Sequence, residues 1–280
     1  MKGEGAVLKR KLLTTISIIF LLLGSALIIV PQVSNEVGKQ QARSEVEEFD
    51  NLKKEINKTA NKKPQTNTKS STEGNTKEEK AASSNSYQPI KTITYKNSKG
   101  ETVTYKIDID KLYRDSLTYN ENLKKNQYDL LIDKNSYKRA ALDLKKYGVP
   151  NNVYGYITAP TIGMELPIYL GANDYSMSVG AAHMTYTSLP LGGKNTNCVL
   201  AAHTGYIGRI FFDYIRDLNV GDDVKVTNFW NKLNYKVIKK HIYKNYESSD
   251  CYISEGKDLL TLITCAYGGS ERYYVICERS

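Results

Sequence analysis

The sequence predicts a mainly β protein: a closed or nearly closed β-barrel with short helices, preceded by a transmembrane helix and a flexible tether. From residue 153 onward, short runs rich in β-branched and aromatic residues are broken by Gly, Pro, Asn and Asp. Strands spaced this closely are typical of a barrel. Residues 12–30 carry no charge, and in residues 57–86 alanine is the only hydrophobic residue. These two stretches set the barrel apart from the N-terminus.

The N-terminal apolar run has the length of a membrane span. As a helix its 19 residues would extend roughly 28 Å, about the thickness of a bilayer's hydrocarbon core. Lys9, Arg10 and Lys11 precede the run, and this charge bias predicts a cytoplasmic N-terminus. We therefore expect a single-pass anchor in the cell membrane, with everything from Pro31 outside the cell. A cleaved signal peptide is the competing interpretation, although the residues around Ala26 make a poor cleavage region.

The segment after the apolar run is predicted to be a spacer. Val46, Phe49, Leu52 and Ile56 recur at helical spacing among charges, which indicates a short amphipathic helix just outside the membrane. The low-complexity stretch that follows cannot bury enough apolar area to offset its ordering entropy. We expect it to be a tether that lifts the barrel off the membrane.

A hairpin and a helix are predicted between the spacer and the barrel. Residues 91–95 and 101–109 alternate polar and apolar side chains on either side of an Asn-Ser-Lys-Gly turn, which predicts a hairpin. A helix is expected over residues 136–147, with Gly148 as its C-cap. The pattern of residues 89–135 predicts no function.

The barrel itself is built from seven expected strands. They cover residues 153–159, 165–170, 198–202, 223–227, 233–239, 259–264 and 273–277, with a short helical stretch over 209–218. We therefore divide the chain into four parts: a tail and signal-anchor helix (1–30), a juxtamembrane helix and tether (31–88), an N-terminal appendage (89–150) and the barrel domain (151–280).

Charge and cysteine usage exclude several classes. The net charge of +9 has no basic block, whereas a nucleic-acid-binding protein would cluster its basic residues on one element. Four cysteines without a C-x-x-C pair argue against a disulfide scaffold and a zinc ribbon. Cys198, Cys251 and Cys277 could pair outside the cell, but we expect all three to be free.

Cys265 is the candidate nucleophile. It ends the run Leu-Leu-Thr-Leu-Ile-Thr and opens into the loop Ala-Tyr-Gly-Gly-Ser. A cysteine beside a buried strand is more often a small core residue. Here, however, Arg272 begins the next expected strand and lies within reach of a thiolate across the hairpin. A cation at that place lowers a thiol pKa and can stabilise an oxyanion.

His203 is the candidate proton shuttle, because it also follows an apolar strand and precedes a Thr-Gly pair. His183 lies in a Gly/Ala-rich loop, and His241 follows two lysines. A lone histidine at a strand end is ordinarily structural. Together with a strand-end cysteine and an arginine, it completes the set of groups that nucleophilic catalysis requires.

These residues carry a resemblance to a known family. Thr-Leu-Ile-Thr-Cys265, with Arg272 seven residues later and Ala-His203-Thr-Gly 62 residues upstream, resembles the signature of the sortases, the cysteine transpeptidases of Gram-positive cell surfaces. The similarity extends from about residue 154 to the C-terminus. It implies a closed eight-stranded sortase-type barrel.

Within the family, residues 183–193 and 211–223 are most similar to class C, the pilin-polymerising type. The chain departs from that class in lacking an Asp-Pro-aromatic lid motif over residues 112–152 and a second transmembrane helix at its end. The loop between Cys265 and Arg272 is also short. These departures leave wall attachment and pilus polymerisation both open.

The resemblance implies a mechanism. Cys265 would attack the bond between Thr and Gly of an LPxTG-like sorting signal on a surface protein or pilin, and His203 would protonate the leaving amine. Arg272 would stabilise the oxyanion, and an amine from a peptidoglycan cross-bridge or a pilin lysine would resolve the acyl-enzyme. Thr264 and His183 are expected to contact the substrate. No metal or cofactor is implied.

Two alternatives use the same residues differently. A membrane-anchored hydrolytic cysteine protease would resolve the acyl-enzyme with water instead of an amine. A non-catalytic surface adhesion module would make the coincidence of Cys265, His203 and Arg272 accidental.

Overall fold

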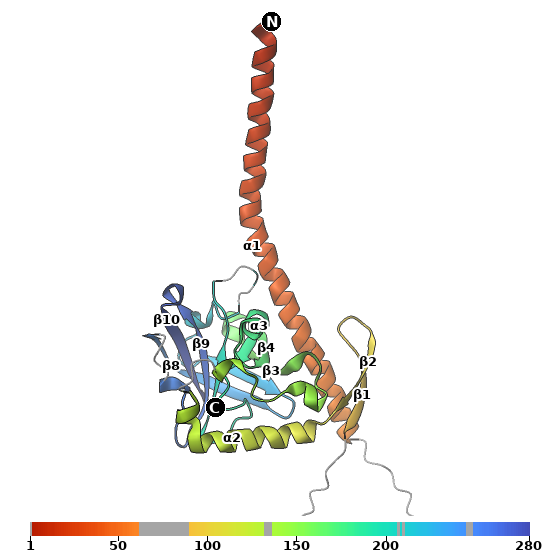
Figure 1. Ribbon diagram of the computed structural model, residues 1–280, viewed down its shortest axis with the longest axis vertical. Helices are drawn as coiled ribbons and strands as arrows, with labels where there is room; N and C mark the ends of the chain where they lie inside the picture. Colours follow the sequence, from red (N-terminus) through yellow and green to blue (C-terminus); the bar gives the residue numbers. More distant parts are fainter. Residues whose placement is uncertain (1, 62–89, 132–135, 206–207, 209–210, 245–248) are drawn as a thin grey trace, which may run out of the picture.

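The structure is a computed structural model that describes residues 2–61, 90–131, 136–205, 208, 211–244 and 249–280. Most of the low-complexity stretch, which we expect to be a tether, therefore lies outside the described residues. A long N-terminal helix projects from a β-barrel, and a second helix crosses the barrel at the end opposite to this projection (Figure 1).

Eight strands close into a barrel in the order β10-β8-β7-β3-β4-β5-β6-β9. All neighbours are antiparallel except the parallel pairs β4–β5 and β6–β9. The strands are β3 (Val153–Ala159), β4 (Met164–Leu170), β5 (Ala181–His183), β6 (Thr196–Ala201), β7 (Asp223–Asn228), β8 (Lys232–Lys244), β9 (Asp258–Ala266) and β10 (Glu271–Arg279). The predicted closed eight-stranded barrel is confirmed, and β5 is the strand that the sequence pattern missed.

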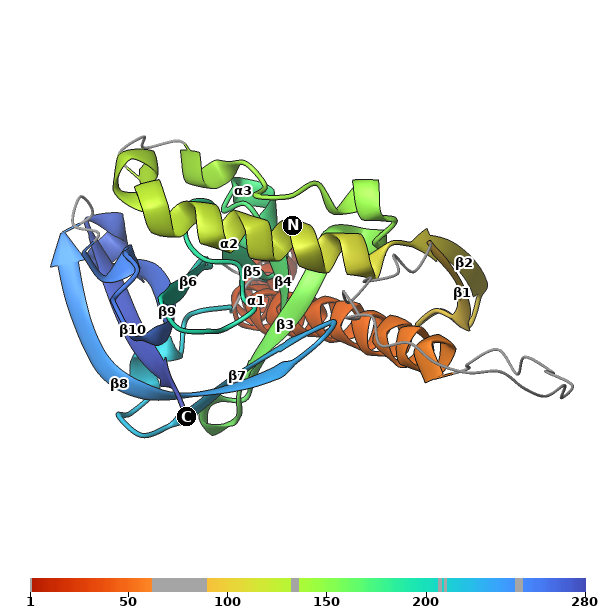
Figure 2. The same cartoon turned by 90° about the horizontal axis from the view of Figure 1, so that it is seen from below.

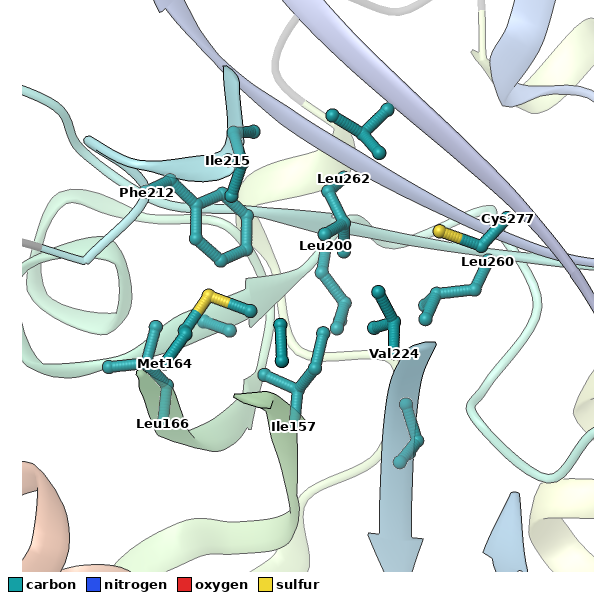
Figure 3. Close-up of a cluster of buried hydrophobic side chains, with 14 of the residues drawn as sticks. Ile157, Met164, Leu166, Leu200, Phe212, Ile215, Val224, Leu260, Leu262 and Cys277 are labelled. Atoms are coloured by element: carbon teal, nitrogen blue, oxygen red, sulfur yellow. The ribbon is translucent and has the colours of Figure 1, made fainter. Parts of the chain in front are cut away.

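The interior of the barrel is filled by alternate side chains of its strands. Leu200, Leu262 and Val224 are fully buried there, and the thiol-bearing Cys277 lies among them (Figure 3). Phe212 and Ile215, from the connection between β6 and β7, cover one end of this core. Within that connection the described residues form only the short 3-10 helix η5 (Ile215–Asp217), which is shorter than the helical stretch expected over 209–218.

Short helices lie before the barrel and in the connections between its strands. They are η3 (Pro150–Asn152) directly before β3, then η4 (Pro160–Ile162), α3 (Asp174–Val179), η6 (Ser249–Cys251) and η7 (Tyr267–Gly269).

The N-terminal helix α1 (Lys2–Asn61) is continuous through Pro31. Its first half is exposed, and by length and composition α1 can cross a membrane. The predicted amphipathic helix is the second half of α1, where Val46, Phe49, Leu52 and Ile56 are all at least 95% buried. Their side chains pack against tyrosines on the outer surface of β3 and β4, so this part of the helix belongs to the folded domain.

A hairpin, β1 (Lys91–Lys96) and β2 (Thr102–Ile107), follows the low-complexity stretch. The hairpin lies beside α1, where the Glu48 carboxylate accepts hydrogen bonds from the Tyr95 hydroxyl (2.5 Å) and the Ser98 backbone N–H (2.9 Å). The described residues on either side of the stretch therefore belong to one body, and the expected tether itself stays a prediction.

Besides the hairpin, the appendage contains a long helix, α2 (Ile109–Leu131). The hairpin was predicted, but α2 was not. Figure 2 shows α2 running across the barrel, with the hairpin beyond its N-terminal end. Buried Gln127 joins α2 to two loops: its amide nitrogen donates to the carbonyls of Tyr186 (3.0 Å) and Cys251 (3.4 Å), and its oxygen accepts from the Ile253 N–H (2.8 Å).

The helix expected over residues 136–147 is wrong. Two 3-10 turns occupy its ends, η1 (Ser136–Lys138) and η2 (Leu144–Tyr147). The Tyr137 carbonyl accepts hydrogen bonds from the backbone N–H groups of Ala172 (2.9 Å) and Thr185 (3.4 Å). Bonds from outside the segment therefore replace helical ones. Gly148 does cap η2 in the left-handed conformation, as predicted.

Candidate active site

Strand register brings the three predicted catalytic residues together. Cys265, one residue before the end of β9, is paired with Arg272 at the start of β10. On the other side of β9, Ala201 of β6 is paired with Ile263 in parallel register. His203 follows Ala201 by two residues, as Cys265 follows Ile263, and the Ala202 N–H still donates to the Ile263 carbonyl (3.3 Å) beyond the end of β6. We therefore expect His203 to lie near the level of Cys265.

The three residues also share one face of the sheet. Side chains alternate along a strand, and Leu200, Leu262 and Val275 point into the barrel core. The odd-numbered residues of β6 and β9 and the even-numbered residues of β10 therefore point outward. Cys265 and Arg272 fall in these outward sets, His203 follows two residues after the outward-facing Ala201, and all three are partly exposed.

Cys265 differs from the other cysteines in its exposure. Cys198, Cys251 and Cys277 are buried, and all four thiols are free, as expected. Burial raises the pKa of Cys251 and of Cys277 to about 12 and raises that of Cys198 further. A buried thiol with a raised pKa forms little thiolate, which is the nucleophilic species. Cys265 is therefore the thiol that a peptide can reach.

Arg272 is held in place by the turn between the two strands. Its Nη1 donates to the carbonyl oxygens of Gly269 (2.8 Å) and Glu271 (3.0 Å). Because the guanidinium is planar, two bonds at one nitrogen fix the directions of its other donors. The arrangement suits a group that stabilises negative charge beside Cys265.

The connection that carries His203 is fixed by backbone contacts. The Phe212 N–H donates to the His203 carbonyl (3.2 Å), and the Gly205 N–H donates to Asp213 Oδ1 (2.8 Å). Thr264 contributes to the same support, because its hydroxyl donates to the Ala202 carbonyl (2.8 Å) and its side chain is buried. This bond ties β9 to the residue before His203, and the expected substrate contact of Thr264 stays a prediction.

His183 lies in β5, not in a loop, and is fully buried. Its Nε2 lies 3.1 Å from the carbonyl oxygens of both Thr187 and Ser188. Burial lowers the pKa of His183 to about 4. The burial and the hydrogen bonds favour a structural role, and the expected substrate contact of His183 stays a prediction.

The sequence pattern missed the neighbours of Arg272 on β8. Tyr243 is paired with Arg272 across the sheet, and its ring packs on those of His241 (4.5 Å between centroids) and Tyr274 (5.3 Å). His241 is hydrogen-bonded to Asp250. Apolar and polar residues alternate along β8, and this alternation could have indicated that His241 and Tyr243 face outward. No sequence motif marks them as part of a site. Among the described residues, no three His, Cys, Asp or Glu side chains group together as a metal site.

Comparison with known proteins agrees with this geometry. Residues 157–280 match the family model of the sortase domain. The chain is 30% identical over 140 residues to sortase A of Bacillus anthracis, a match that covers 49% of this chain and 61% of that relative. The chain thus spans about three-fifths of the curated relative's length.

Solved structures show the same fold. The pilus-related sortase C of Group B Streptococcus is 28% identical, with a TM-score of 0.53 over 61% of this chain and 89% of that one. Sortase C-1 of Streptococcus pneumoniae is 26% identical, with a TM-score of 0.54 over the same shares. In sequence and in fold, the barrel domain of this chain is similar to the sortases.

Proposed function

We propose that this protein is a cysteine transpeptidase that cleaves sorting signals and transfers the acyl part to an amine. The observation that supports the proposal is the register of the sheet: the partly exposed Cys265 is paired with Arg272, and Ala201, two residues before His203, is paired with Ile263. A nucleophile, a proton shuttle and a fixed cation on one face are the groups that acyl transfer needs.

The steps follow from these positions. The Cys265 thiolate attacks the carbonyl carbon between Thr and Gly of an LPxTG-like signal, and Arg272 stabilises the oxyanion. The C–N bond breaks as protonated His203 gives its proton to the leaving amine. A second amine then attacks the thioester, gives up a proton to His203 and releases Cys265. The new peptide or isopeptide bond replaces the one that was cut.

The proposed substrates are surface proteins or pilins, and the accepting amine is either a peptidoglycan cross-bridge or a pilin lysine. Structural similarity to enzymes described as sortase C and as pilus-related supports the pilin lysine as the accepting amine. The exposed apolar half of α1 supports anchoring in the cell membrane, with the barrel on the extracellular face.

The experiment is a product analysis. The full chain in detergent is incubated with a library of LPxTG-type peptides and with cross-bridge or pilin-lysine amines, and the products are identified by mass. We expect cleavage between Thr and Gly and a product joined to one amine. Cys265→Ala should lose both, whereas Cys251→Ala, a buried thiol in the same chain, should keep both.

Other products would select another function. Hydrolysed peptide alone, at any amine concentration, would identify a protease. No reaction, together with a Cys265 thiol that resists alkylation, would leave a non-catalytic module.

A further inference from the structure

One face of α1 follows the barrel along the whole second half of the helix. The residues on this face recur at alternating spacings of four and three, which places them on one side of a helix. They contact the barrel, line the cavity beside it or are buried against it: Asn35, Lys39, Ala42, Val46, Phe49, Lys53 and Ile56. The docked face therefore begins at Asn35, only five residues after the apolar run ends at Val30.

The first contact of this face is with the connection that carries His203. Asn35 Oδ1 accepts a hydrogen bond of 2.6 Å from the Gly208 N–H. Gly208 has a φ of +80°, and a Cβ added there would stand 3.4 Å from the Ser34 side chain. That distance is an ordinary van der Waals contact, and it is the positive φ that favours glycine. Gly208 thus fits the chain against α1, while the Phe212 N–H holds the other end of the connection to the His203 carbonyl.

This contact has a fixed distance from the membrane. Five helical residues from Val30 to Asn35 rise about 8 Å. The polar layer of each leaflet is about 5–8 Å thick. Because α1 is continuous from the apolar run into the docked face, Gly208, which is bonded to Asn35, is held at the outer edge of the headgroup layer.

We propose that α1 fixes the height of Cys265 above the bilayer, and thereby sets how close to its membrane anchor a substrate can be cut. The inference rests on the proposed transpeptidase function and on membrane anchoring by residues 12–30. The partner that it names is a membrane-retained protein whose scissile bond is separated from its own apolar helix by only a few residues.

The test lengthens α1 without rotating its docked face. Seven helix-forming residues inserted after Gln32 make about two turns, so the face keeps its direction while the barrel rises about 10 Å. The full chain is reconstituted in liposomes with substrates in which zero to twenty residues separate the scissile bond from an apolar helix. An extended residue spans about 3.3 Å. We expect the shortest spacer that is cleaved to increase by about three residues.

The control places the same seven residues after Asn75, in the stretch whose two ends attach to one body. This variant should keep the wild-type spacer dependence. Cleavage of a soluble peptide should be equal in all three proteins, and its loss from the wild type would refute the proposed function rather than this inference. A spacer minimum that does not move on lengthening α1 would overturn the inference. If the lengthened variant does not cleave the soluble peptide, the test uses the wild type alone. Wild-type cleavage that does not depend on spacer length would then overturn the inference.

Discussion

Arg272 has a place in the hairpin that a lysine could not fill. Its guanidinium is bonded to two turn carbonyls while it lies beside Cys265. Arg272→Lys keeps the charge but loses the planar arrangement of donors. Removing one oxyanion donor costs about 2.7–4 kcal/mol, so we expect roughly a hundred- to thousandfold lower kcat.

The measurement is steady-state cleavage of the preferred peptide by Arg272→Lys, with Arg279→Lys at the far end of the same strand as the control. Alkylation of Cys265 in both variants shows whether the thiol is still presented. A rate within a few-fold of wild type would remove Arg272 from the mechanism.

His183 makes stability depend on pH. Its pKa is about 4 in the folded chain, compared with roughly 6.5 when exposed. As the pH falls from 6.5 to 4 the unfolded chain takes up a proton that the folded chain does not, so stability is complete above 6.5 and decreases below it. The difference amounts to about 3 kcal/mol.

His183→Gln should remove most of this dependence, because glutamine can donate a hydrogen bond but does not titrate. Urea unfolding at pH 7 and pH 4.5 measures it, with His241→Gln as the control. Equal losses of stability in the wild type and His183→Gln would show that other groups cause the acid sensitivity.

Among the elements, α2 depends on polar contacts. Gln127 is buried and bonds to Tyr186, Cys251 and Ile253. Gln127→Leu would leave two carbonyls and one N–H without this partner, at a cost of about 1–3 kcal/mol for each group that water does not reach. We expect a lower Tm in thermal unfolding. Asn122→Leu, on the exposed side of α2, should change the Tm little, and equal effects of the two would contradict the role of Gln127.

The same polar contacts explain why the sequence did not predict α2. Its buried face consists of Ile109, Leu112, Ser116, Asn120, Leu123 and Gln127, which follow helical spacing. Three of the six are polar, so the face leaves no continuous apolar stripe in the sequence. The hydroxyl and amide groups are matched to residues far along the chain, such as Tyr154 and Leu189, and a local pattern carries no such information.

The longer strands could be predicted because their signals are local. Each is an alternating or apolar run, and several end at Gly, Pro or Asn, as β3, β4 and β7 do. The prediction of Cys265 and His203 as reactive residues rests on their places at or just beyond the ends of such runs. Strand β5 has only three residues, too few to alternate. His183 was misplaced for the same reason, since its burial depends on the neighbouring strands β4 and β6.

For the whole molecule, the second half of α1 is part of the domain's stability. Burial of an apolar side chain contributes about 1.5–3 kcal/mol, so Val46, Phe49, Leu52 and Ile56 together contribute about 6–12 kcal/mol as an upper estimate. This is comparable with the entire stability of a typical domain, about 5–15 kcal/mol. A tether that only positioned the barrel would contribute nothing.

Two truncations test whether the second half of α1 stabilises the domain or only positions the barrel. A chain of residues 31–280 should unfold cooperatively, with an alkylation rate of Cys265 like that of the full protein. A chain of residues 90–280 lacks the helix and exposes Tyr156 and Tyr169 on the surface that α1 covers, so we expect it to lose its cooperative transition or aggregate. Adding a peptide of residues 31–61 should restore the transition, because it supplies the missing apolar face, whereas the same peptide with Phe49→Ala should restore it poorly. A 90–280 chain with the Tm of the longer one would show that α1 adds no stability to the barrel.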